Sequence, residues 1–145
     1  MANHEQRFYR LTWPILLAAI QESSIAAGKF GRWRQNVENM MAWIYLVLAG
    51  LFEIGWPVGL KMAQSPETRW SGIGISFVFM GASGFLLWLA QRQIPIGTAY
   101  AVWTGIGAAG TFLVGVLYYG DPTSLMRYVG VALIVAGVAT LKLAY

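Results

Sequence analysis

The stretch LVLAGLFEIGWPVGLKM, residues 46–62, places one acidic side chain, Glu53, near the middle of an apolar run that begins at Trp43. About 20 residues at a helical rise of 1.5 Å cross the roughly 30 Å hydrocarbon core of a bilayer, so this run predicts a membrane-spanning helix. A charged carboxylate at its midpoint is costly unless it is protonated, paired or hydrated. Glu53 is therefore a candidate for an ion-binding or proton-binding residue. The alternative is a structural acid that is satisfied by Lys61, two helical turns away, or by a polar neighbour.

The composition places the whole chain in a membrane. Of its 145 residues 57% are hydrophobic and 11% are charged, and the mean hydropathy is +0.55, which is too apolar for an ordinary soluble domain. Cysteine is absent and His4 is the single histidine, so we expect neither a metal site nor a cofactor. The net charge of +4 is spread over segment ends, which indicates topology signals and no nucleic-acid partner.

Four apolar stretches of spanning length follow one another with short polar connections. Breakers separate them at Pro66, at Gln91-Arg92-Gln93 and at Gly120-Asp121-Pro122. Stretches of this length with short turns exclude a membrane β-barrel. The sequence therefore predicts an all-α membrane protein with four transmembrane helices, at about residues 43–62, 71–90, 96–119 and 125–143.

Residues 1–40 differ in character from the rest of the chain. Their apolar run, Leu11–Ile20, is short for a span and contains Pro14, and no clear cleavage site of a signal peptide follows it. The remaining interpretations are an interfacial amphipathic helix or an upstream extension, with Met41 as a plausible start. We divide the chain into residues 1–40, an N-terminal extension of unclear role, and residues 41–145, a four-helix membrane domain.

The basic residues give two conflicting topology signals. Within residues 41–145 the two membrane sides are nearly balanced, which allows insertion in both orientations. The two sides carry Arg92 and Lys142 against Lys61, Arg69 and Arg127. The extension adds basic residues that favour a cytoplasmic N-terminus, namely Arg7, Arg10, Lys29, Arg32 and Arg34.

Several polar or unusual residues share faces with Glu53 or lie deep in other spans. Trp56 follows Glu53 by three residues and shares its face. Pro57 has no N–H, so it leaves the Glu53 carbonyl without its helical partner and should kink the helix, either for function or as a tolerated bend. Ser76 and Ser83 lie two turns apart in the second span. Either hydroxyl can bond back to its own helix, an interpretation that we favour for Ser76.

The third and fourth spans carry aromatic and small residues. Tyr100, Trp103 and Gly107 lie at i, i+3 and i+7, and they predict a pocket wall, with an interfacial aromatic belt as the alternative. Gly105 and Gly107, with Gly110, would let this helix bend or let a neighbour approach. In the fourth span the stretch between Gly130 and Gly137 has no polar side chain. It predicts an association face, with ordinary lipid packing as the alternative.

Three motifs together carry a resemblance to a known family. They are AGLFEIGWPVGLK at residues 49–61, PIGTAYAVWTGIGAAG at 95–110, and GVALIVAG at 130–137 followed by Leu141-Lys142. Because three separate motifs recur in order and at the right spacing, the match is highly specific. Residues 41–145 resemble the small multidrug resistance family and, within it, the guanidinium exporter branch.

The resemblance implies an antiparallel homodimer with one shared site, built from both copies of Glu53 and from the matching pocket residues Trp56, Ser83, Tyr100 and Trp103. Trp56 and Ser83 favour the guanidinium branch over the quaternary ammonium exporters. Pro57 departs from the better-known guanidinium exporters, which have a small residue other than proline there, and some family members work as paired unlike subunits.

These observations predict a proton-coupled antiporter that exports guanidinium across the cytoplasmic (inner) membrane of a bacterium, and not an enzyme. Its expected partners are guanidinium or a related small cation, protons, membrane lipid and a second subunit. A planar guanidinium ion matches a carboxylate bidentately and stacks on indole rings. Protons and guanidinium therefore compete for Glu53, and no nucleotide-binding motif offers another energy source. The alternatives are an exporter of quaternary ammonium or aromatic cations and a non-transporting membrane assembly subunit.

Overall fold

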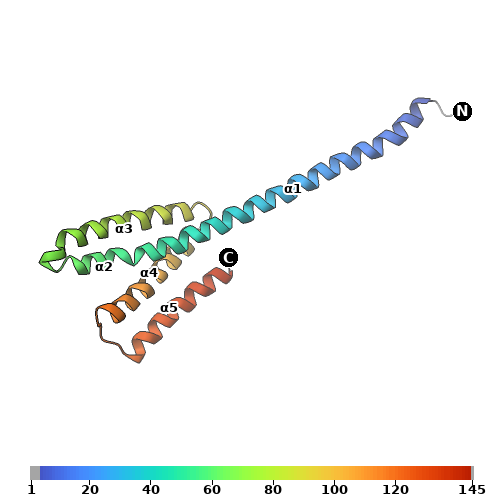
Figure 1. Cartoon of the computed structure of the whole chain (residues 1–145). Coiled ribbons are helices and arrows are strands. Elements are labelled where there is room, and N and C mark those ends of the chain that lie inside the picture. The colour runs from blue at the N-terminus through green and yellow to red at the C-terminus, as the bar shows by residue number, and fades with distance from the viewer. Residues whose placement is uncertain (1–3, 145) are drawn as a thin grey trace. The chain divides into compact units, whose positions relative to one another are not determined.

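The computed structural model describes the backbone of residues 4–144 and the side chains of residue 21 and residues 28–144. Within these residues the secondary structure is entirely helical, which confirms the predicted all-α class. The elements, shown in Figure 1, are α1 (His4–Glu53), α2 (Gly55–Met62), the 3-10 helix η1 (Pro66–Thr68), α3 (Arg69–Ala90), α4 (Ile96–Tyr118) and α5 (Leu125–Ala144).

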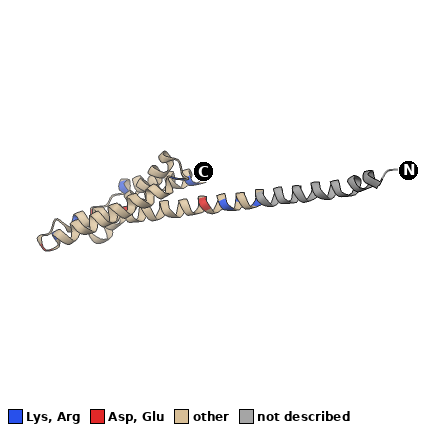
Figure 2. Cartoon of the chain, turned by 90° about the horizontal axis from the view of Figure 1, so that it is seen from above, with Lys and Arg blue, Asp and Glu red and all other residues tan. Residues whose placement is uncertain are grey.

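Four segments are long and apolar enough to cross a membrane, as the sequence predicts. They are Gly28–Met62, Pro66–Ala90, Ile96–Tyr118 and Leu125–Ala144. Figure 2 shows the described helices coloured mostly tan, with charged residues at few positions. The chain is thus a multi-pass membrane protein.

The first helix begins much earlier than the predicted span, at His4 and not near Trp43. Residues 28–42 contain no proline, and Arg34 donates a hydrogen bond from Nε to Glu38 Oε1 at 3.0 Å, a spacing that supports a helix. The chain forms two compact units, Met1–Glu38 and Asn39–Tyr145. The side chains of Leu11–Ile20, the run for which an interfacial helix is one interpretation, and of the topology signals Arg7 and Arg10 lie outside those described.

A break in helical hydrogen bonding separates α1 from α2. It falls at Ile54, three residues before Pro57, and the Ile54 N–H bonds to the Leu51 carbonyl at 3.3 Å. Ile54 keeps helical dihedrals, with φ −64° and ψ −31°. The helix loses a hydrogen bond here because proline cannot donate to the Glu53 carbonyl. The backbone nevertheless keeps its helical course and continues as α2.

Small residues bring α2 and α3 into backbone contact, and Figure 1 shows the two helices side by side. A Cβ added at Gly59 would lie 2.7 Å from the Gly72 carbonyl oxygen, so no larger side chain fits there without a shift. The Ser76 hydroxyl lies 2.9 Å from the Gly72 oxygen and 2.9 Å from the Trp56 oxygen. The predicted bond of Ser76 to its own helix is confirmed. The single hydroxyl proton is shared between this bond and the bond to the Trp56 carbonyl, which ties α3 to α2.

The core of the Asn39–Tyr145 unit draws residues from α1, α3 and α4 and from the α3–α4 connection. Its buried members include Leu46, Ala90, Ile94, Ala99 and Val102.

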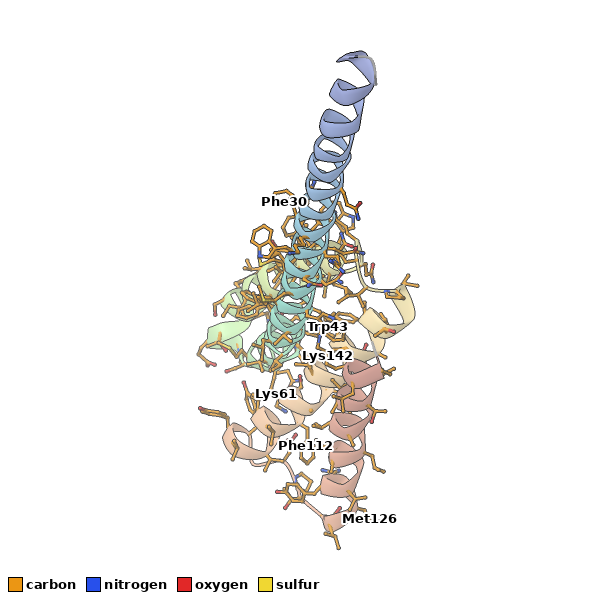
Figure 3. The ribbon with its side chains drawn as sticks, turned by 90° about the vertical axis from the view of Figure 1, so that its right-hand side faces the viewer. Phe30, Trp43, Lys61, Phe112, Met126 and Lys142 are labelled. Atoms are coloured by element: carbon orange, nitrogen blue, oxygen red, sulfur yellow. The ribbon has the colours of Figure 1, made fainter. Side chains whose placement is uncertain are left out.

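The last helix, α5, lies at the edge of this core. It has no buried residue, and it approaches α4 where Val138 faces Gly105. Near its end the Lys142 ammonium lies 3.6 Å from the centroid of the Trp43 ring. Both residues are labelled in Figure 3. Most of the α5 surface is therefore left for lipid or for another subunit.

Candidate functional site

The carboxylate of Glu53 stands at the C-terminal end of α1, at the break before α2, and is partly buried. Its Oε1 accepts a hydrogen bond from the Trp56 indole, with an Nε1–Oε1 distance of 2.6 Å. Its Oε2 accepts one from the Ser83 hydroxyl of α3 at 2.8 Å. Because both donors bind the same carboxylate from different helices, the group has a fixed orientation.

Ser83 is the junction of this network and is 0% exposed. Its Oγ accepts a hydrogen bond from Trp103 Nε1 of α4 at 2.8 Å. The same oxygen lies 2.9 Å from the Ala49 carbonyl oxygen and 2.8 Å from Glu53 Oε2. A hydroxyl has one proton to donate, so Ser83 serves one of these two acceptors at a time.

This arrangement accommodates two proton states of Glu53. When the carboxylate is ionised, Ser83 donates to it. When Glu53 is protonated, its acid O–H can donate to Ser83, whose own proton then turns to the Ala49 carbonyl. The Trp103 indole donates to Ser83 in both states. Neither state leaves a buried polar group without a partner.

Glycines of α4 allow the close approach that encloses Glu53. A Cβ added at Gly107 would lie 2.6 Å from Glu53 Cγ, and one at Gly110 would lie 2.1 Å from Ile54 Cδ1. One turn earlier on α1, a Cβ at Gly50 would lie 2.7 Å from Ile106 Cβ. Helix α4 is uninterrupted over Ile96–Tyr118. The glycines thus permit tight contact, and a role of Gly105 and Gly107 in bending stays a prediction.

Tyr100 is connected to the site differently from the other four predicted pocket residues. Its ring centroid lies 5.2 Å from that of Trp103, at an interplanar angle of 52°. The Tyr100 side chain is 56% exposed, and among the described residues no hydrogen bond joins it to Glu53. Tyr100 therefore extends the aromatic surface beside the carboxylate network without entering the network itself.

Polar neighbours, Trp56 and Ser83, bond to Glu53, whereas neutralisation by Lys61 finds no support in the described part of the chain. No ion pair within 4.0 Å joins Lys61 to Glu53 there, and the Lys61 ammonium lies 6.0 Å from the centroid of the Tyr119 ring.

The predicted association face on α5 is open along the described chain. A Cβ added at Gly130 or Gly137 would meet nothing within 4 Å. The assignment of Gly130 and Gly137 to a subunit interface stays a prediction. Among the described residues no group of three metal-ligating side chains of the His, Cys, Asp and Glu types is present.

Two features of the site were not predicted from the sequence. One is the Ala49 carbonyl as a second acceptor for Ser83, although Ala49 precedes Glu53 by four residues and so lies on the same helix face. The other is the direct contact of Gly107 with the Glu53 side chain. A small residue one helical turn from a membrane acid is a signal that could have indicated the first; no sequence signal pairs Gly107 with Glu53.

Four membrane-length helices and an acid held by donors from neighbouring helices are features that a small membrane transporter would have. Residues 41–134 match the family model described as Small Multidrug Resistance protein. The chain belongs to this family, which confirms the predicted resemblance.

Relatives named as guanidinium exporters share most of their length with this chain. A protein of Yersinia pseudotuberculosis named "Guanidinium exporter" is 50% identical over 104 residues, which cover 72% of this chain and 99% of the relative. Proteins of the same name from Citrobacter freundii and Escherichia coli K12 are each 46% identical over 103 residues, covering 71% of this chain and 97% of the relative.

Proposed function

We propose that the chain is a proton-coupled antiporter that exports guanidinium or small guanidinyl cations across the cytoplasmic membrane of a bacterium. The observation that carries the proposal is the pair of hydrogen bonds that fix Glu53 between Trp56 and Ser83. The names of relatives that are matched over nearly their whole length support the choice of substrate.

The unused hydrogen-bond acceptor positions of the Glu53 carboxylate suit a planar cation with forked donors. An ionised carboxylate offers about four acceptor positions, of which the Trp56 and Ser83 bonds occupy two. The remaining positions can accept a bidentate guanidinium. The ring faces of Trp103 and Tyr100, which pack together, supply a surface on which such a cation can stack.

Coupling follows from competition for the same oxygens. A proton on Glu53 removes the negative charge and part of the acceptor capacity that guanidinium needs, while a bound guanidinium ion opposes protonation. Ser83 can donate its proton either to Glu53 or to the Ala49 carbonyl. The site can therefore exchange a proton for guanidinium without leaving a buried polar group unbonded. Exposure of the site to alternate sides of the membrane would convert this exchange into proton-driven export.

We further propose that two copies assemble antiparallel and share one site with two Glu53 side chains. Support comes from the family, from the absence of buried residues on α5, and from the open surface at Gly130 and Gly137. Two carboxylates close together repel each other when both are ionised. A bound cation relieves that repulsion, so a site with two carboxylates binds a cation more strongly than the site of a single copy would.

The test is guanidinium flux into liposomes that contain the purified full chain, driven by an imposed pH gradient. Glu53→Gln should abolish both the flux and the proton release that guanidinium induces. Glu67→Gln is the matched control, because Glu67 lies exposed in the α2–α3 connection. Proton release retained in Glu53→Gln would exclude the proposed role of Glu53. Stronger transport of tetraphenylphosphonium than of guanidinium by the unaltered chain would instead assign it to quaternary or aromatic cations.

A further inference from the structure

We propose a second, outer cation site between α2 and α4, with Asp121 as its anionic group, through which guanidinium reaches Glu53. This inference rests on the proposed export function and adds a place on the substrate's path. Its basis is a pocket of about 180 Å³ whose lining includes Pro57 and Lys61 of α2, Thr111 of α4, and Tyr119 and Asp121 beyond the end of α4.

The pocket begins one helical turn from the central site, on both of its helices. Pro57 follows Glu53 by four residues, and Thr111 follows Gly107, which contacts the Glu53 side chain, by four residues. The same faces of the two helices therefore line first the carboxylate and then the pocket. Because Pro57 cannot donate a hydrogen bond, the Glu53 carbonyl is left as a further acceptor between the two.

The turn after α4 directs the Asp121 carboxylate back onto the helix. Gly120 adopts the left-handed conformation with φ +66°, which favours glycine. The backbone N–H groups of Tyr119 and Asp121 both donate to the Gly115 carbonyl, at 3.1 and 3.0 Å. A Cβ added at Gly115 would lie 2.5 Å from Asp121 Oδ2. The carboxylate thus lies against the α4 backbone only because residue 115 has no side chain.

The electrostatics of this position favour a cation. The C-terminal end of a helix carries unpaired carbonyl groups and a partial negative charge, so an aspartate there is disfavoured by itself. In the part of the chain that the structure describes, the Asp121 carboxylate has no ion pair within 4.0 Å and no hydrogen-bond donor. Guanidinium would supply forked donors to this carboxylate, and the Tyr119 ring can stack on its planar face.

Lys61, labelled in Figure 3, limits the affinity of this outer site. Its ammonium lies 6.0 Å from the Tyr119 ring centroid and lines the same pocket, so the formal charges of Lys61 and Asp121 cancel. A site on a conduction path must bind its ion strongly enough to admit it and weakly enough to release it. The pair of opposite charges meets that requirement better than an isolated carboxylate would.

Two variants remove the outer site in different ways. Asp121→Asn removes the charge, while Gly115→Ala keeps the charge and displaces the carboxylate, because the new Cβ would occupy its place. We expect each to raise the KM for guanidinium flux about tenfold, the lower end of electrostatic focusing effects. The equilibrium affinity of the central site, measured by guanidinium-induced proton release in detergent, should stay unchanged. A merely structural change would alter both quantities.

The controls separate a local site from general effects. Glu67→Gln removes one negative charge from the α2–α3 connection, at the same end of the helices, and Gly97→Ala adds a Cβ to α4 in open space. Neither should change KM. A KM that rises equally in Glu67→Gln and Asp121→Asn, or that stays constant in both Asp121→Asn and Gly115→Ala, would overturn the proposal.

A binding measurement makes the inference independent of transport. In the full chain carrying Glu53→Gln, saturation-transfer NMR should detect weak guanidinium binding that disappears when Asp121→Asn is added. Binding that persists in the double variant, or that is absent in Glu53→Gln, contradicts the outer site. Absence of flux in the unaltered chain, with this weak binding present, would count against the export function alone.

Discussion

Replacing Ser83 by alanine tests the central network most directly. The change removes one hydroxyl that takes part in contacts with Glu53 at 2.8 Å, the Ala49 carbonyl at 2.9 Å and the Trp103 indole at 2.8 Å. The smaller side chain fits the fully buried position, so the variant alters hydrogen bonding more than packing. It keeps Glu53 and both indoles, and with them the charge and most of the shape of the site.

The expected loss of guanidinium affinity follows from the difference in hydrogen-bond energy of Ser83 between the cation-bound and the protonated states of Glu53. In the cation-bound state Ser83 donates to a charged carboxylate, a bond that contributes about 1.5–3 kcal/mol. In the protonated state it bonds to neutral groups, which contribute about 0.5–1.5 kcal/mol. The difference of roughly 1–1.5 kcal/mol corresponds to guanidinium binding about tenfold weaker in Ser83→Ala. The orphaned Trp103 N–H should also lower the free energy of unfolding by about 1–3 kcal/mol.

Isothermal titration calorimetry of the purified chain with guanidinium measures the first quantity, and thermal unfolding measures the second. Ser76→Ala is the matched control, because its hydroxyl bonds to the Trp56 and Gly72 carbonyls and not to Glu53. An unchanged Kd in Ser83→Ala would refute the reasoning. An equal loss in Ser76→Ala would do so as well, since it would attribute the effect to helix packing.

Two further substitutions test the close helix contacts. Gly107→Ala would place a Cβ 2.6 Å from Glu53 Cγ and should weaken guanidinium binding more than tenfold by displacing the carboxylate. Calorimetry measures this Kd. The control Gly97→Ala, in open space on the same helix, should leave the Kd unchanged. Gly59→Ala would place a Cβ 2.7 Å from a backbone oxygen of α3 and should lower the thermal midpoint by about 5 °C or more, measured by tryptophan fluorescence. An equal shift in Gly74→Ala, whose Cβ meets nothing within 4 Å, would contradict that account.

The positions of the spans could be predicted from the sequence because a membrane imposes strict conditions. Each span needs a long apolar run and satisfies its backbone internally, so the breaks at Pro66 and around Gly120 determine where helices end. The predicted stretches 71–90, 96–119 and 125–143 agree with α3, α4 and α5 to within two residues. The start of the first helix escaped prediction, because polar residues can continue a helix beyond the apolar run.

The partners within the site were predictable only where they are local. The bond between Trp56 and Glu53 joins residues three apart, and helix geometry alone places them on one face. The bonds of Ser83 to Glu53 and to Trp103 join residues 30 and 20 apart. Periodicity gives the face on which a side chain lies but not the helix that this face meets. The resemblance to a family, and not the pattern of residues, brought Ser83 and Trp103 together before the structure did.

The contact between α4 and the α1–α2 segment explains how one pair of helices can hold a carboxylate tightly and still admit a cation. At Gly107 the backbone of α4 closes on the Glu53 side chain, while one turn further Pro57 and Thr111 line a pocket. The close contact at Gly107 and the pocket thus follow each other along the same helix interface. On the proposed path a cation first occupies this pocket and then approaches the carboxylate along the contact between α4 and the α1–α2 segment. Substitutions at Gly107 should therefore act on the affinity of the central site, whereas those at Asp121 should act on the rate of access, and the two experiments examine separate steps.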